Sequence, residues 1–152
     1  MEKDLNFQKA IKHLFHLEGG YSNNKYDKGG ETNYGITQKT YTAYLKKQNL
    51  QNKTVKQITK EDAISIYYQE YWLPSGASKI LDFKLAYLLF DSCVNHGLSC
   101  GKNLYKKSNG DFQKFIDLRR EKYSSIVRNN PTQKIFLNGW LNRLSYINNH
   151  LL

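Results

Sequence analysis

DFKLAYLLFDSCVN, residues 82–95, is the most apolar stretch of this 152-residue chain. Asp82 is of a residue type that caps helix N-termini, and the apolar residues after it occupy nearly every side of a helix. A helix of this kind is one that other helices surround. The stretch is also shorter than the ~20 apolar residues that a membrane span needs. We therefore expect residues 82–95 to form the central helix of a soluble, mainly helical fold.

Helical periodicity extends on both sides of this stretch. Thr37 and Thr59 are predicted to cap helices that run to about Gln48 and Trp72, and Pro131 is predicted to begin the last helix. No period of 20–50 residues repeats, which argues against a solenoid. The other expected helices cover residues 5–18, 99–107 and 111–129.

Residues 21–36, YSNNKYDKGGETNYGI, interrupt the helical pattern. The segment is rich in Gly, Asn and Asp, which are typical of turns. Its short Tyr-containing pieces leave room for a small hairpin but not for a helix. The predicted fold class is therefore mainly α, with a small irregular or β-hairpin insertion after the first helix.

Length and charge limit the remaining possibilities. A chain of 152 residues is of the common size for one domain, so we expect residues 1–152 to form a single unit with sequence halves 1–76 and 77–152. The net charge of +10 favours an acidic partner, such as nucleic acid, anionic lipid or an envelope polymer. The N-terminal sequence MEKDLNFQKAIKHLF lacks the continuous apolar segment of a secretory signal, so we expect synthesis in the cytoplasm.

The two cysteines, Cys93 and Cys100, stand seven positions apart. Two helical turns separate their Cα atoms by about 10 Å, beyond disulfide reach unless the helix breaks at Gly97. We therefore expect two reduced thiols rather than a disulfide. Neither these cysteines nor the histidines show metal-ligand spacing, so no metal site is predicted.

Glu18 is the main anomaly in the first helix. It follows Leu14 by four positions and Phe15 by three, which places a carboxyl group on the buried stripe. A carboxyl in apolar surroundings loses solvation of its charged form, which suits a general acid. The alternative is that the helix frays at Gly19 and Glu18 points into water.

Asp27 lies nine residues after Glu18, in the glycine-rich turn. Two carboxylates in contrasting environments are the arrangement of glycosidases, in which one is the acid and the other holds water or stabilises positive charge. Asp is also an ordinary turn residue, so from the residues alone both interpretations of Asp27 stay open.

Five segments of the chain carry a family resemblance: EGGY (18–21), DKGGETNYGIT (27–37), IYYQEYW (66–72), FDSCVNHG (90–97) and LRREKYSSIVRNNPTQKIFLNGWLNR (118–143). The first three resemble glycoside hydrolase family 108, whose members are N-acetylmuramidases of phage endolysin and secretion-associated type. The last two resemble the predicted peptidoglycan-binding region that follows in these proteins. The resemblance implies a lysozyme-like fold of two lobes.

The resemblance also implies roles for residues near the first motif. The catalytic glutamate of the family corresponds to Glu18 of the EGGY motif, which would be the general acid. Asp27 fits the water-holding carboxylate of the wider phage lysozyme pattern, and Thr32 fits the supporting hydroxyl, although one residue closer than that pattern has it. Glu31 stands where family members often have proline, so it is an alternative carboxylate partner for Glu18.

Substrate contacts are predicted in both halves of the chain. Tyr34 and Tyr21 offer aromatic faces to sugar rings, and the Asn33 amide can reach hydroxyls, although tyrosines also pack cores. Asp91 and Asn95 share one helix face at i, i+4, where polar groups either satisfy each other or line a cleft. The resemblance favours the cleft.

The predicted function is hydrolysis of the β-1,4 bond between N-acetylmuramic acid and N-acetylglucosamine. The expected partner is the peptidoglycan glycan strand, bound by a monomer without cofactor, membrane insertion or specific nucleic acid. The enzyme would reach the periplasm or wall through a holin, an exporter or lysis. The alternatives are a lytic transglycosylase, a non-catalytic peptidoglycan-binding or secretion-accessory module and, from charge alone, a nucleic-acid binder.

Overall fold

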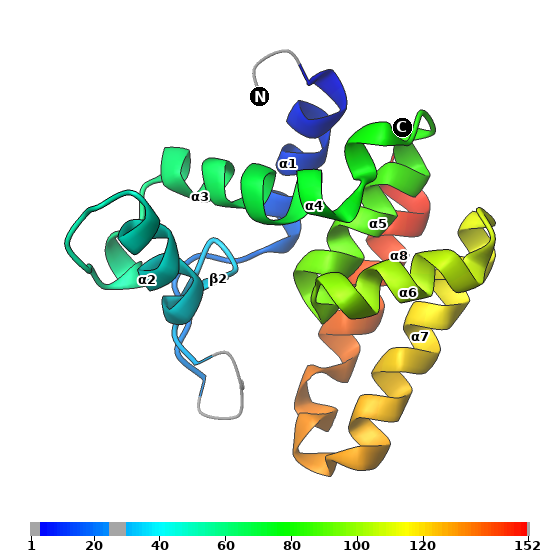
Figure 1. The fold of residues 1–152 in the computed structure, drawn as a ribbon. Helices are drawn as coiled ribbons and strands as arrows, with labels where there is room; N and C mark the ends of the chain where they lie inside the picture. Colours follow the sequence, from blue (N-terminus) through cyan, green and yellow to red (C-terminus); the bar gives the residue numbers. More distant parts are fainter. Residues whose placement is uncertain (1–3, 25–29, 152) are drawn as a thin grey trace.

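Helix α5 (Phe83–His96) is the central helix of the computed structural model, which describes residues 4–24 and 30–151 (Figure 1). Asp82 caps it by accepting a hydrogen bond from the backbone N–H of Leu85 at 3.2 Å. The eight side chains from Ala86 to Cys93 are all buried. The sequence prediction of a central apolar helix is confirmed.

The first lobe contains the N-terminal helix, the hairpin and a second helix. Figure 1 shows the hairpin and α2 side by side, near the end of α3 (Lys60–Tyr67) that is remote from α5. Thr37 caps α2 as predicted, since its side chain accepts from the backbone N–H of Thr40. The elements are α1 (Leu5–Leu17), β1 (Thr32–Asn33), β2 (Ile36–Thr37), α2 (Gln38–Lys47) and the 3₁₀ turn η1 (Val55–Gln57).

A long helical segment leads from this lobe to α5. Thr59 caps α3 (Lys60–Tyr67), which continues through the π-helical segment η2 (Tyr68–Trp72) into α4 (Leu73–Ser75). The helix thus extends past the predicted end at Trp72 and includes Pro74, which follows the π-helical segment directly. Gly76 then ends the segment with φ +87°.

The second lobe packs its helices around α5, as Figure 1 shows for α6, α7 and α8. Pro131 begins a 3₁₀ segment rather than the last α-helix itself, which corrects the predicted start by six residues. The elements are η3 (Ala77–Lys79), α6 (Leu98–Ser108), α7 (Phe112–Asn129), η4 (Pro131–Phe136) and α8 (Leu137–His150).

The buried side chains form one apolar cluster that draws on both sequence halves. Aromatic rings join its parts, as where Phe7 of α1 contacts Trp72 and Phe90 at centroid distances of 5.6 and 6.2 Å. The fold is mainly α, lysozyme-like and bilobal with a small hairpin after the first helix, as predicted.

Two further predictions concern the cysteines and membrane spans. Cys93 and Cys100 are both free thiols, which confirms that they form no disulfide. Burial raises the pKa of the Cys93 thiol to about 12, so this side chain is an unreactive core residue. Within residues 4–24 and 30–151, no helix is long and apolar enough to span a membrane.

Candidate active site

Glu18 occupies the C-cap of α1, where its backbone N–H donates to the Leu14 carbonyl at 2.8 Å. The backbone of Glu18 is extended, with φ -84° and ψ 135°, so the helix ends at this residue. Only 17% of the Glu18 side chain is exposed. It lines a cavity of about 480 Å³ together with His16, Asn95, Trp140 and Arg143. The structure therefore places Glu18 in a half-closed cavity rather than in open water.

Arg143 of α8 is the charged partner of Glu18. Its Nη2 donates to Glu18 Oε1 at 2.9 Å, and its Nε and Nη2 also donate to Asp91 at 3.0 and 2.7 Å. Although burial opposes the charge, Asp91 and Glu18 hold the pKa of Arg143 well above its usual range. Glu18 thus lies beside a fixed cation, and not in the purely apolar surroundings that its position in the sequence suggested.

Asp91 is the centre of this ionic cluster and has no exposed surface. Besides Arg143, it accepts from Arg119 Nη1 at 2.6 Å and from the Tyr87 hydroxyl at 3.1 Å. Burial raises the pKa of Asp91, but the two guanidinium groups outweigh burial and hold it below its usual value. No atom of Asp91 reaches the surface in this structure, and its predicted contact with substrate stays a prediction. Its role is to fix two arginines.

A second branch of hydrogen bonds runs from Asp91 to Asn95. Arg119 Nη2 donates to the Tyr123 hydroxyl at 2.7 Å, and that hydroxyl donates to Asn95 Oδ1 at 2.5 Å. Asn95 lines the cavity of Glu18 and is half-buried. The structure therefore brings Asn95 to the candidate site, and its contact with substrate stays a prediction.

The hairpin closes another side of Glu18. Thr32 pairs with Thr37 and Asn33 with Ile36, which leaves Tyr34 and Gly35 as a two-residue turn with φ +53° and +78°. Two positive φ angles are the mark of a type I′ hairpin turn. The Tyr67 hydroxyl donates to the Tyr34 carbonyl, which ties this turn to α3.

Gly35 is required by space as well as by backbone angle. A Cβ at this position would lie 2.6 Å from Glu18 Cδ and 2.7 Å from the Tyr67 hydroxyl. We predict that Gly35→Ala lowers the free energy of unfolding by about 1–3 kcal/mol, because backbone strain and the contact with Glu18 add. The substitution should also slow the cleavage reaction expected from the sequence, because it displaces Glu18. Urea unfolding and cleavage rates measure the two effects.

Gly110 provides the matched control for this substitution. It has the same φ of +78°, but a Cβ there would meet nothing within 4 Å. Gly110→Ala should therefore carry the backbone strain alone and leave the cleavage rate unchanged. Equal effects of the two substitutions would contradict a specific contact between Gly35 and Glu18.

The remaining predicted residues that the structure describes lie on the hairpin side. Asp27 lies outside the described residues. Thr32 pairs through its backbone with Ser22, and Asn33 Nδ2 donates to the Lys56 carbonyl at 3.1 Å. Neither of these contacts leads to Glu18, so the roles predicted for Thr32 and Asn33 stay predictions.

Two tyrosines and Glu31 complete that side. The Tyr34 ring packs on Phe15 at 5.3 Å, and the exposed Tyr21 lies near Lys56. Glu31 accepts from the Thr54 hydroxyl at 3.0 Å, and its hydrogen bond with Tyr21 raises the pKa of that tyrosine. Substrate contacts of both tyrosines stay predictions.

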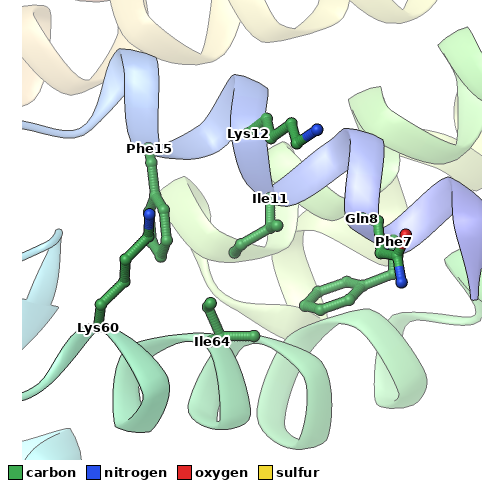
Figure 2. A pocket seen from close by; sticks show the side chains of 7 residues that line it. All are labelled: Phe7, Gln8, Ile11, Lys12, Phe15, Lys60 and Ile64. Atoms are coloured by element: carbon green, nitrogen blue, oxygen red, sulfur yellow. The ribbon is translucent and has the colours of Figure 1, made fainter. Parts of the chain in front are cut away.

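Another pocket, between α1 and α3, does not contain a group that could act as the general acid. Figure 2 shows Phe7, Ile11 and Phe15 of α1 facing Ile64 of α3, with lysines at the rim. Its lining includes no carboxylate among the described residues. Within the same part of the chain, no group of three or more His, Cys, Asp or Glu side chains could hold a metal ion.

Sequence reasoning missed Arg119 and Arg143, the two cations of the cluster. A signal was present in each case. Arg119 follows Phe115 by four positions and Ile116 by three, which places it on the buried face of α7. A charged residue on a buried stripe is the anomaly that identified Glu18, and the same test finds the two cations of the cluster.

Comparison with known proteins complements this geometry. The solved structure of Brucella abortus SagA is similar to the chain, with a TM-score of 0.74, 24% sequence identity and coverage of 93% of this chain and 90% of that one, which shows a shared fold. No curated protein sequence matches significantly. The family model described as Glycosyl hydrolase 108 matches residues 11–97, more than half of the chain. The chain therefore belongs to the glycosyl hydrolase 108 family, the peptidoglycan-cleaving glycosidases.

Proposed function

We propose that this chain is an N-acetylmuramidase, which hydrolyses the β-1,4 bond between N-acetylmuramic acid and N-acetylglucosamine, and that Glu18 is its general acid. The observation that carries the proposal is the position of Glu18. Among the described residues that line the cavity, it is the one carboxylate. A glycosidase requires an acid within reach of the glycosidic oxygen, and the position of Glu18 in this cavity supports its assignment as that acid.

In the proposed reaction Glu18 donates its proton to the glycosidic oxygen as the bond to the sugar C1 breaks. Positive charge develops at C1, and a water molecule adds there. Asp27 is proposed to orient this water and to accept its proton. Proton exchange with solvent then restores both carboxyl groups for the next cycle.

Arg143 supports the proton-transfer step. Once Glu18 has given up its proton it carries a negative charge, and the guanidinium at 2.9 Å stabilises that charge. Because Asp91 fixes Arg143 through further hydrogen bonds, the cation is held in place before the reaction begins. Fixed charges of this kind need no reorganisation in the transition state.

We also propose that the C-terminal helices bind the glycan strand as part of the same site. Trp140, Asn142 and Arg143 of α8 line the cavity of Glu18, although α8 follows the family-matched residues 11–97. The net charge of +10 would assist adsorption to the anionic cell wall, and this attraction would weaken as the salt concentration rises. On this proposal the second half completes the cleft.

A lytic transglycosylase is the second candidate function. Such an enzyme needs one glutamate and no carboxylate that holds water, since the sugar's own hydroxyl attacks C1. The cavity presents one carboxylate among the residues that the structure describes, which favours this candidate. The two reactions differ in their product ends.

Product analysis distinguishes the candidates. The full chain is incubated with isolated peptidoglycan, and the soluble fragments are analysed by mass spectrometry. Reducing N-acetylmuramic acid ends are expected. Ends with a 1,6-anhydro ring would identify a transglycosylase, reducing N-acetylglucosamine ends would change the bond assignment, and an absence of fragments would favour a binding module.

A further inference from the structure

A second cavity of about 210 Å³ adjoins the cavity of Glu18. It lies between α5, α7, η4 and α8, and Asn95 and Trp140 line both cavities. Its volume is below the range of pockets that hold drug-sized ligands, ≈ 300–1,000 Å³, so it has room for a small group such as one sugar ring. A polymer that reaches Glu18 can therefore extend into this second cavity.

Aromatic rings form one wall of the second cavity. Trp140 stacks on Tyr123 with ring centroids 4.9 Å apart and an interplanar angle of 14°, and Phe136 lies 5.9 Å from Trp140 at 30°. Trp140 and Phe136 keep part of their surface exposed, whereas Tyr123 is buried behind them. The negative faces of aromatic rings attract the C–H groups of a pyranose.

Uncharged hydrogen-bonding groups form another part of the lining. Burial, together with Arg119, lowers the pKa of His96 to about 3, so its ring is neutral in ordinary conditions. Arg119 Nε donates to His96 Nε2 at 3.3 Å, which leaves the ring proton on Nδ1 as a donor. Asn95 uses Oδ1 to accept from Tyr123, so its Nδ2 group is a second donor. Donors of this kind suit the hydroxyl and acetamido oxygens of a sugar.

The charges argue against an acidic peptide stem as the occupant. Arg119, the nearest cation, has no exposed surface and is paired with Asp91 at 2.6 Å. A peptide carboxylate entering the cavity would therefore lose water without gaining a cation. An uncharged sugar meets no such penalty.

We propose that the second cavity, bounded by Asn95, His96 and Trp140, is a subsite for one N-acetylated sugar of the glycan strand. The sugar it holds adjoins the one whose bond meets Glu18. The inference rests on the proposed function, since the strand must pass Glu18. Asp91 serves both places, because it fixes Arg143 beside Glu18 and, through Arg119 and Tyr123, Asn95 in the subsite.

Tryptophan fluorescence tests this subsite directly. The chain has two tryptophans, and Trp72 is fully buried with its indole N–H bonded to Asp4, so a ligand-induced change reports on Trp140. The full chain carrying Glu18→Gln is titrated with N-acetylglucosamine and its β-1,4-linked oligomers. A saturable change in Trp140 emission is expected, together with a shift of its indole N–H resonance in NMR spectra.

Variants in the same Glu18→Gln chain then measure affinity by calorimetry. Trp140→Ala and Phe136→Ala are each expected to raise the oligomer Kd by about five- to tenfold, the size of an aromatic contact. Phe112→Ala removes a half-buried ring of α7 that does not line the cavity, and it should leave Kd unchanged. Circular dichroism checks that each variant is folded.

Two results would overturn the subsite. One is that the Glu18→Gln chain, with no further substitution, binds the oligomers without any change at the Trp140 indole. This measurement does not depend on the folding of any alanine variant. The other is a response of Trp140 to a free stem peptide but not to the sugars. Persistent cleavage by Glu18→Gln would instead refute the proposed acid and leave the sugar-binding result intact.

Discussion

Replacing Glu18 with glutamine is expected to slow peptidoglycan cleavage by roughly 100- to 10,000-fold, the contribution of a positioned general acid. Glutamine has nearly the same shape, and its amide oxygen can still accept a hydrogen bond from Arg143 Nη2. The substitution therefore removes the transferable proton while keeping the contact that joins α1 to α8. The rate at which soluble fragments are released measures the effect, and urea unfolding checks that stability is kept.

Glu31→Gln is the matched control. Glu31 lies in the same lobe, is half-buried and accepts a hydrogen bond from the Thr54 hydroxyl, but it does not line the cavity of Glu18. Its replacement should leave the rate close to that of the unaltered chain. A Glu18→Gln rate close to that of the unaltered chain would refute Glu18 as the acid, whereas similar losses in the two variants would make Glu31 its partner carboxylate.

Asp27→Asn addresses the second carboxylate in the proposed hydrolysis. If Asp27 orients the water, this variant loses activity whereas Glu31→Gln keeps it. The reverse pattern would make Glu31 the partner of Glu18. Full activity in both variants, with 1,6-anhydro ends in the products, would fit a transglycosylase.

Local sequence signals predicted most of the fold because they act over a few residues. Asp82, Thr37 and Thr59 each cap a helix at the expected place, and each side chain accepts a hydrogen bond from a backbone N–H three positions later. One helix end was less predictable than these helix starts. The helix expected to end at Trp72 continues through a π-helical segment to Ser75.

The candidate site was predictable only in part, because its contacts join distant segments. Glu18 could be found from helix periodicity, but its partner Arg143 is 125 positions away. The buried stripes of α7 and α8 contain Arg119 and Arg143, so the sequence showed that these cations needed partners. That Arg119 and Arg143 both pair with Asp91 follows only from the packing of α7 and α8 against α5.

Periodicity also could not separate two uses of one polar helix face. Asp91 and Asn95 stand one turn apart on α5, and both were expected to line a cleft. The structure buries Asp91 completely and leaves Asn95 half-buried at the cavity. The difference arises because Asp91 lies where α7 and α8 meet α5, while Asn95 lies nearer the end of the helix.

Replacing Asp91 with asparagine is expected to lower the free energy of unfolding by about 3–5 kcal/mol, the cost of breaking a buried ion pair. The buried guanidinium groups of Arg119 and Arg143 would lose the carboxylate that compensates their charge. The asparagine amide oxygen can accept only part of these hydrogen bonds, so Arg143 would also be held less firmly beside Glu18. Urea unfolding at neutral pH measures the loss of stability.

Asp117→Asn is the matched control, because Asp117 pairs with Arg120 on the surface with both side chains more than half exposed. Exposed pairs contribute about 0–1 kcal/mol, so this variant should unfold almost as the unaltered chain does.

The loss of stability in Asp91→Asn should also depend on pH in a defined direction. Since the pKa of Asp91 is lowered by folding, its stabilising effect is present above its ordinary pKa of 3.8 and is lost as pH falls further. The difference in free energy of unfolding between the unaltered chain and Asp91→Asn should therefore become smaller under acid conditions. A difference that became larger there would contradict a paired, buried carboxylate at the centre of the site. So would a loss of stability in Asp91→Asn that is no larger than the loss in Asp117→Asn at neutral pH.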